Sequence, residues 1–158
     1  LKLAEGDVGR ERNAMSLDAN KDLVRHITEQ GMNRGNTDLD HLFAPDYQVH
    51  GAGLSLPPGP VAYYTAIGLW RNAFPDWHVS IEHMVAEGEF VANRFRTTGT
   101  HQGPLFGVAP TFRSVEVQGT DMHRVVDGVV VESWISDDVP RIIADLGIGE
   151  VLAARGAR

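Results

Sequence analysis

The amino-acid sequence predicts an α+β domain in which a curved antiparallel sheet carries helices packed on one face. Helical periodicity is confined to the part of the chain before Phe74 and to a last segment that begins at Pro140. Between them, strand-like segments form two hairpins around residues 87–89 and 127–128. Because helices and hairpins are segregated along the chain, an antiparallel sheet covered by helices is favoured. Such a sheet encloses a concave space, where ligand sites commonly lie.

Length, charge and cysteine content restrict the class of protein. The 158 residues suit one domain, expected over residues 16–158, and we expect residues 1–15 to be a flexible leader. A net charge of −7, from 14 basic and 21 acidic residues without a basic cluster, argues against nucleic acid or an anionic membrane as partner. No apolar run approaches the roughly 20 residues that a membrane span requires. The sequence has no cysteine, which excludes disulfides and thiolate sites and fits a cytoplasmic protein.

Two helical segments open the domain. Ser16 and Asp18 are candidate N-caps of a first helix that extends to about Arg34, with apolar residues on one face at helical spacing. After a turn, a capping pattern predicts a short helix over residues 37–43. We expect Pro45 to end that helix.

A short strand and an aromatic helix follow. The strand covers residues 46–50, and a loop leads from it to Pro60, a residue well suited to the first turn of a helix. This helix is expected to end near Phe74. Its stripe at three- and four-residue steps, predicted to line the core or an apolar cavity, consists of Tyr63, Tyr64, Ile67, Trp70, Arg71 and Phe74.

Four strands and a last helix complete the domain. Asp127-Gly128 is the strongest turn signal, because both residues tolerate the positive φ that a two-residue hairpin turn requires. The last helix is expected from Pro140 to about Ala154. The predicted strands cover residues 77–86, 90–101, 114–126 and 129–136.

The strand over residues 114–126 places two polar side chains on its apolar face. Successive side chains alternate, so Asp121 and His123 share a row with Val115, Val117 and Val125. A carboxylate in that row must be hydrogen-bonded, charge-paired or protonated, because burying it alone is costly. Such a group suits general acid/base chemistry, but a purely structural Asp held by backbone amides or by His123 fits the same pattern.

Three stretches together resemble the SnoaL-like polyketide cyclases of the ketosteroid-isomerase-like, nuclear transport factor 2-like superfamily. They are NKDLVRHITEQGMNRGNTDLDHLFAPDYQVHG, AFPDWHVSIEHMVAEGEFVANRFRTTGTHQGPLFGVAPT and VEVQGTDMHRVVDGVVVESWISDD. The resemblance covers roughly residues 19–138 and implies a cone-shaped α+β barrel, a homodimer, and cofactor-free intramolecular aldol ring closure. It also implies that Asp121, in VQGTDMHR, is the general acid/base.

The sequence departs from the family pattern at two places. Residues 110–112 read Pro-Thr-Phe where the family commonly has Pro-Thr-Gly, so the loop at Phe112 is expected to differ. His123 occupies a position that is more often apolar or aromatic in the family. Both departures suggest a cavity of altered polarity, with a different substrate or reaction.

Further side chains are candidates for contacts with a ligand. His101 shares its row with Phe95 and is expected either to hydrogen-bond a substrate carbonyl as a catalytic group or to sit at the barrel mouth without a role. His50 either lines the pocket or ends its strand, and Trp134 is expected to shape the cavity wall. The substrate-contacting set that we predict is His50, Tyr63, Ile67, Trp70, Phe74, Phe95, Phe106 and Trp134.

Several functions remain as alternatives. Asp121, His123 and His101 are the ligand types of a two-histidine, one-carboxylate metal site, but the resemblance implies no metal and no cofactor. Epoxide hydrolysis would need an Arg two residues before Asp121, where Gly119 stands. We favour a polyketide cyclase that acts on an apolar, carbonyl-bearing small molecule. A cofactor-independent hydroxylase, an isomerase or a non-catalytic small-molecule-binding dimer stay open.

Overall fold

A computed structural model describes residues 16–51 and 55–156, so the leader expected over residues 1–15 lies outside the described residues. The helices are α1 (Leu17–Ile27), a π-helical turn η1 (Thr28–Asn33), a 3₁₀ turn η2 (Asp40–Leu42), α2 (Pro60–Ala73), α3 (Val139–Leu146) and α4 (Gly149–Gly156). The strands are β1 (Phe43–His50), β2 (His78–Glu87), β3 (Phe90–Thr100), β4 (Ser114–Val126) and β5 (Val129–Asp137).

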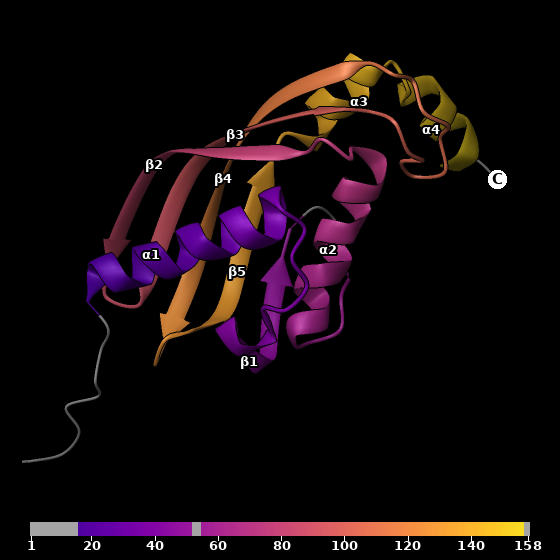
Figure 1. The fold of residues 1–158 in the computed structure, drawn as a ribbon. Coiled ribbons are helices and arrows are strands. Elements are labelled where there is room, and N and C mark those ends of the chain that lie inside the picture. The colour runs from indigo at the N-terminus through magenta and orange to yellow at the C-terminus, as the bar shows by residue number, and fades with distance from the viewer. Residues whose placement is uncertain (1–15, 52–54, 157–158) are drawn as a thin grey trace, which may run out of the picture.

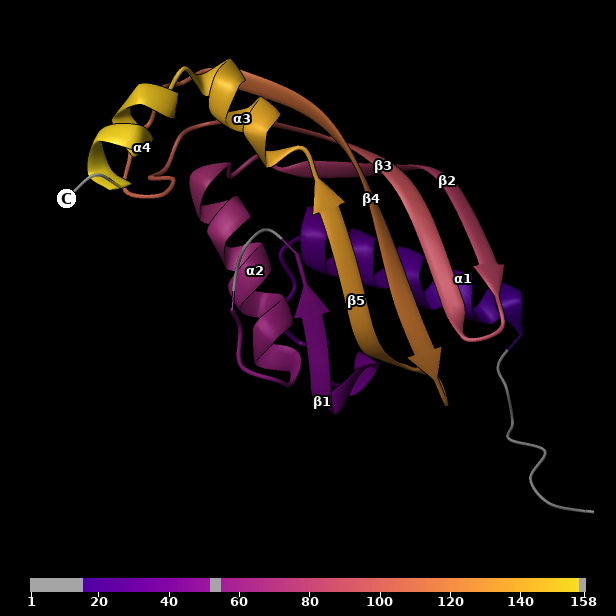
Figure 2. The same cartoon turned by 180° about the vertical axis from the view of Figure 1, so that it is seen from behind.

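The five strands form one curved, open sheet in the order β1-β5-β4-β3-β2 (Figure 1). Helix α1 crosses the concave face, and α2 lies beside β1 (Figure 1). No described helix covers the opposite face (Figure 2). The predicted α+β class and both hairpins are confirmed. One pairing differs, since β1 runs parallel to β5 and the sheet is therefore not wholly antiparallel.

Helix α1 begins as the sequence suggests but changes its hydrogen-bonding pattern before it ends. Ser16 is the N-cap, and its hydroxyl accepts a hydrogen bond from the Ala19 amide at 3.1 Å. At Ile27 the helix passes into the π-helical turn. There the Tyr63 hydroxyl donates to the Ile27 carbonyl at 3.1 Å. A Cβ at Gly31 would lie 2.0 Å from that hydroxyl oxygen, so only glycine lets Tyr63 pack against the turn.

Gly31→Ala is expected to lower the free energy of unfolding by about 2 kcal/mol, because the new methyl group displaces the buried Tyr63 ring. Urea denaturation measures the change. Gly68→Ala on α2 is the matched control: nothing lies within 4 Å of its Cβ, and it should raise stability by about 0.5–1 kcal/mol. An unchanged unfolding midpoint for Gly31→Ala would contradict this account of the turn.

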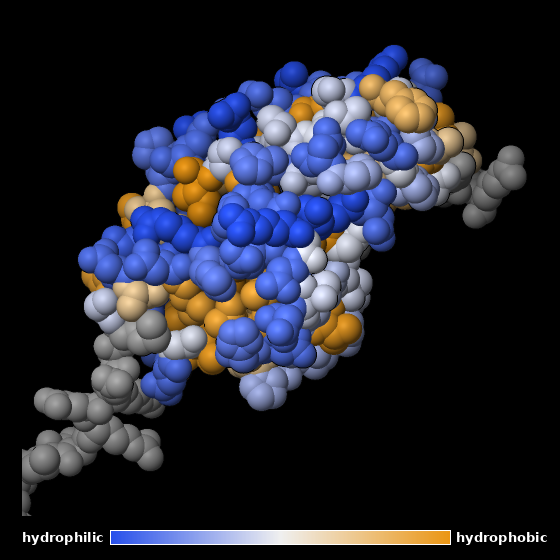
Figure 3. Space-filling view, viewed as in Figure 1, coloured by the Kyte–Doolittle hydropathy of each residue, from blue (hydrophilic) through white to orange (hydrophobic). Residues whose placement is uncertain are grey.

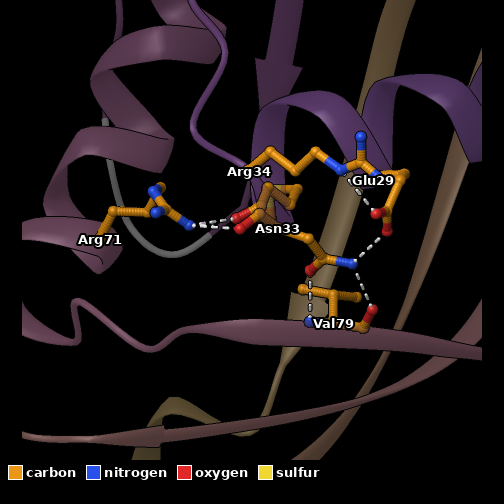
Figure 4. A network of polar contacts seen from close by, with 6 residues as sticks. Glu29, Asn33, Arg34, Arg71 and Val79 are labelled. Atoms are coloured by element: carbon orange, nitrogen blue, oxygen red, sulfur yellow. Dashed lines mark hydrogen bonds and ion pairs between the residues drawn. The ribbon is translucent and has the colours of Figure 1, made fainter.

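A network of polar contacts fixes the π-helical turn to its neighbours (Figure 4). The side-chain amide of Asn33 donates to the backbone carbonyl of Val79 at 3.0 Å, and its oxygen accepts from the backbone N–H of Val79 at 2.7 Å. These two bonds join the helix to edge strand β2. The Arg71 guanidinium of α2 donates to the carbonyls of Met32 and Asn33 at 2.8 and 3.0 Å. Glu29 accepts from the side chain of Asn33 at 3.0 Å. The bonds from Arg71 satisfy two carbonyls that the end of a helix leaves unpaired.

Two predicted elements were wrong in detail. The short helix is only the turn Asp40–Leu42, and β1 already begins at Phe43, so Pro45 lies within the strand rather than after a helix. Proline is tolerated there because β1 is an edge strand. The single last helix is interrupted at Gly147, whose φ of 68° ends α3 before α4 begins. None of the described helices is long and apolar enough to cross a membrane.

The core divides into two clusters along the sheet. One joins α1, β1 and the nearer part of α2 to the sheet, and the other joins the far end of α2 to α3. The first includes Val24, Ile27, Leu39, Phe43, Tyr47, Tyr63, Ile67, Val91, Val125 and Val130. The second includes Trp70, Phe74, Trp77, Val79, Phe95, Leu105, Val115, Val117, Ile142 and Leu146.

Phe112, which replaces the expected glycine of its loop, adopts the backbone conformation that glycine favours. Its φ is 57°, and 73% of the residue is exposed. Phe112→Gly is expected to raise the free energy of unfolding by about 0.5–1 kcal/mol, because glycine carries no steric penalty at positive φ. Thermal unfolding checks this, with Phe112→Ala as the control that removes the ring but keeps the strained backbone. Equal stability of the two variants would contradict the strain.

Candidate active site

An apolar cavity lies between the concave face of the sheet and the helices α1, η1 and α2. Hydrophobic surface is visible below α1, over β1 and β5, bordered by hydrophilic residues along α1 (Figure 3). The apolar wall includes Val24, Ile27, Met32, Phe43, Val49, Leu56, Tyr63, Ile67, Trp70, Val79, Phe95, Val130 and Ile135. The polar groups among the lining residues include Tyr47, Trp77, Asp121, His123, Ser133 and Asp137.

Four of these polar groups form one chain of polar contacts. The Nε2 atom of His123 lies 3.3 Å from Oδ2 of Asp121, and its Nδ1 lies 2.8 Å from Oγ of Ser133. Ser133 also hydrogen-bonds Tyr47, whose pKa burial raises to about 12; the nearby Asp121 charge adds to the rise. Strands β4, β5 and β1 each supply part of the chain. A strand row of alternate residues places Asp121 and His123 together, as predicted.

The two oxygens of the Asp121 carboxylate have different surroundings. Oδ2 lies beside Nε2 of His123, whose other nitrogen, Nδ1, is hydrogen-bonded to Ser133. Oδ1 is buried and has no hydrogen-bond partner among the described residues. The side chains of Asp121 and His123 are only 16% and 15% exposed, so this oxygen is shielded from solvent.

A second carboxyl, Asp137, enters the same cavity from β5. Its Oδ1 is also buried without a hydrogen-bond partner among the described residues. Burial raises the pKa of Asp137 to about 6, and the neighbouring charge of Asp121 adds to that rise. Asp137 is therefore held partly protonated near neutral pH, unlike an exposed aspartate.

The predicted histidines have different positions. His50 lies at the cavity rim, but its ring stacks on Trp134 with centroids 5.6 Å apart and its Nε2 lies 2.8 Å from Glu132. His101 is fully buried outside the cavity lining, where its Nδ1 accepts from the Thr111 amide at 3.1 Å. Burial lowers the pKa of His101. The structure does not bring His101 to Asp121.

The predicted substrate-contacting residues divide into two groups. Tyr63, Ile67, Trp70 and Phe95 line the cavity together with His50. Three others do not. Phe74 is fully buried in the second core cluster, and Phe106 contacts the edge of Trp70 from a loop. Trp134 faces the opposite side of the sheet, next to Phe90, because it alternates with the cavity-lining Ser133 and Ile135.

Sequence reasoning missed Tyr47, Trp77, Ser133 and Asp137. The indole N–H of Trp77 is buried in the cavity wall with no partner among the described residues. Because side chains alternate along β5, Ser133 and Asp137 lie on the same face of the strand. This shared face was the one feature of the sequence that could have pointed to both residues. No three His, Cys, Asp or Glu side chains in residues 16–51 and 55–156 gather as a metal site would require.

Comparisons with known proteins find solved structures of similar fold. AclR from Streptomyces galilaeus, for which a hydroxylase activity has been suggested, is 27% identical, with 84% of this chain and 98% of that one covered at a TM-score of 0.73. IdmH from Streptomyces antibioticus, suggested to be a polyketide cyclase, is 30% identical. The match covers 81% of this chain and 98% of IdmH, with a TM-score of 0.70. A protein from Jannaschia sp. CCS1 is 21% identical. The match covers 87% of this chain and 97% of that protein with a TM-score of 0.76, and it supports the fold alone.

No curated protein matches the sequence. The profile of the SnoaL-like polyketide cyclases matches residues 22–146, which is most of the chain and includes all five strands of the sheet and helix α2. The chain therefore belongs to the SnoaL-like polyketide cyclase family.

Proposed function

We propose that this protein closes a ring in an apolar, carbonyl-bearing polyketide by intramolecular aldol condensation, with Asp121 as the general base. The observation that carries the proposal is the free Oδ1 of Asp121, buried in an apolar cavity while His123 holds Oδ2 at 3.3 Å. A carboxylate fixed in this way is oriented before the substrate arrives, which avoids the cost of ordering it during the reaction.

The chemistry requires only movements of protons and one new carbon–carbon bond. Asp121 removes a proton from a carbon between or beside carbonyl groups, and the enolate carbon attacks a second carbonyl of the same molecule. The Trp77 N–H, buried and unpartnered in the wall, supplies a donor for an oxygen that gains negative charge. The proposed reaction therefore needs no cofactor.

The chain from Asp121 to Tyr47 explains why a histidine at position 123 suits this role. Nε2 of His123 lies against the carboxylate, and the hydrogen bond of Ser133 to the other ring nitrogen restrains the orientation of the imidazole. Tyr47 remains protonated throughout the neutral range because burial raises its pKa to about 12. Together these groups orient Asp121 without adding a second strong base beside it.

Two probe ketones test the proposal on the wild-type protein. In heavy water, NMR should show that the protein accelerates exchange of the α-protons of 2-tetralone, which requires a base but no ring closure. The protein should also accelerate the closure of 2-methyl-2-(3-oxobutyl)cyclohexane-1,3-dione to its bicyclic ketol, followed by chromatography. Rates equal to those of buffer with the same concentration of acetate would contradict acid/base catalysis in this cavity.

A further inference from the structure

We propose that Asp137 is a second catalytic residue, the acid that protonates the alkoxide oxygen formed when the ring closes. The inference rests on the proposed function, because it assigns the second proton transfer of the same reaction. It divides the work between two carboxyls. Asp121 acts as the base, and Asp137 acts as the acid in the fraction of molecules in which it carries its proton.

The strand register places the two carboxyls on one face at a useful separation. Asp121 lies opposite Ile135, and Asp137 lies opposite Gly119, so the two aspartates are diagonal neighbours across adjacent strands. Diagonal neighbours of this kind have Cβ atoms roughly 7 Å apart, which leaves room for reacting substrate atoms between the carboxyls. Both residues line the cavity, and each keeps one buried oxygen without a partner among the described residues.

Gly119 gives Asp137 an apolar surrounding. A Cβ at Gly119 would lie 2.5 Å from the Phe95 ring, so the absence of a side chain lets that ring occupy the space opposite Asp137. A carboxyl beside an aromatic wall is poorly solvated, and poor solvation favours its neutral form.

The surroundings of Asp121 and Asp137 differ, as the roles of base and acid require. Asp121 has a charge-bearing neighbour, because Nε2 of His123 lies 3.3 Å from its Oδ2. No ion pair reaches Asp137 among the described residues, while burial and the charge of Asp121 raise its pKa to about 6. The other titratable groups around the cavity are Tyr47 and Tyr63, which stay neutral, and His50, whose ring is held by Glu132 at the rim.

The proton balance closes over one turnover. Asp121 carboxylate takes the α-proton, so a C–H bond breaks and an O–H bond forms on Asp121. The enolate carbon then forms the ring bond to the second carbonyl carbon, whose π electrons move to oxygen. Asp137 gives its proton to that oxygen and becomes the carboxylate. Asp121 later releases its proton to solvent and Asp137 takes one up, which restores the starting state without an oxidant or a reductant.

The protonation state of Asp137 is the first test, and it needs no substrate. Carbon-13 NMR of protein labelled at the aspartate carboxyls, with the Asp137 signal assigned by its loss in Asp137→Asn, should show a midpoint about two pH units above that of exposed aspartates. In Asp121→Asn this midpoint should move down, because the neighbouring charge is gone. An Asp137 signal that titrates with the exposed aspartates would overturn the proposal.

The division of labour is tested with the two probe ketones. Asp137→Asn should retain α-proton exchange on 2-tetralone within about threefold and lose ring closure of the triketone by roughly 100-fold. Asp137→Glu, which keeps an acid, should restore part of the closure. Asp138→Asn is the matched control, since the adjacent Asp138 is an exposed N-cap of α3 where asparagine serves equally well.

The outcomes separate the two proposals. Wild-type closure by Asp137→Asn would overturn the role of Asp137 and leave Asp121 as the base. Wild-type exchange and closure by Asp121→Asn would overturn the proposed function itself. Loss of closure in Asp137→Asn, exchange retained and partial rescue by Asp137→Glu would support the division of roles.

Discussion

Asp121→Asn is expected to lower the rate of α-proton exchange on 2-tetralone about 1,000-fold while ligand binding is retained. A positioned general base contributes roughly 10²–10⁴ to a rate, and the amide has no basic oxygen of comparable strength. Asparagine has nearly the same shape as aspartate. The contact with His123 at 3.3 Å can therefore be kept by the amide. Only the proton acceptor is lost.

Binding and catalysis are measured separately in this experiment. Trp70 and Trp77 line the cavity, so intrinsic fluorescence reports ligand entry in both proteins. Asp127→Asn is the control, because Asp127 lies exposed in the β4–β5 turn at a φ of 50°, which asparagine tolerates. Full exchange activity in Asp121→Asn, or an equal loss in Asp127→Asn, would mean that the cavity carboxylate is not the base.

Alternation along β4 could be read from the sequence because the two faces of that strand differ strongly. Val115, Val117 and Val125 are buried in the structure, and Asp121 and His123 join them on the cavity side. A one-residue shift would have turned every valine outward, so the pattern fixed the orientation of the aspartate without any tertiary information.

The same reasoning could not orient β5, because one extra residue changes its register. Val125 pairs with Val130, but Arg124 pairs with Glu132, so Val131 is an additional residue in β5. Beyond such a bulge the side chains exchange faces. A regular hairpin would place Trp134 opposite Asp121. The bulge instead turns Trp134 away and brings Ser133, Ile135 and Asp137 to the cavity. Sequence alone gave no signal for the bulge, which explains both the wrong place for Trp134 and the missed Asp137.

Strand alternation also says nothing about position along a strand. His101 shares the inward row of Phe95, as predicted, yet it follows the last residue of β3 and contacts Phe74 with ring centroids 5.5 Å apart. That end of the sheet is filled by the second core cluster, with Leu105 and Ile142 fully buried. The cavity forms only where α1 and the π-helical turn stand over the sheet. This arrangement depends on long-range packing that local patterns do not encode.

Asp137→Asn is expected to stabilise the protein at neutral and alkaline pH, although it removes a residue of the proposed catalytic pair. Burial raises the pKa of Asp137 from its ordinary 3.8 to about 6, so the folded protein holds this proton more tightly than the unfolded chain does. Stability contributed by the protonated form is fully present below about pH 4 and is lost as pH rises through 6. A shift of about two units corresponds to about 3 kcal/mol above pH 7.

Urea denaturation of the wild type and Asp137→Asn between pH 4 and pH 8 measures this difference. Because all other titrating groups are shared, subtracting the two curves isolates Asp137. The advantage of the variant should grow from near zero at pH 4 to a plateau of about 3 kcal/mol above pH 7. In the Asp121→Asn background the plateau should shrink, because the charge of Asp121 contributes to the raised pKa. A difference independent of pH would mean that Asp137 titrates alike in folded and unfolded protein. In that case the cavity would not hold Asp137 as an acid.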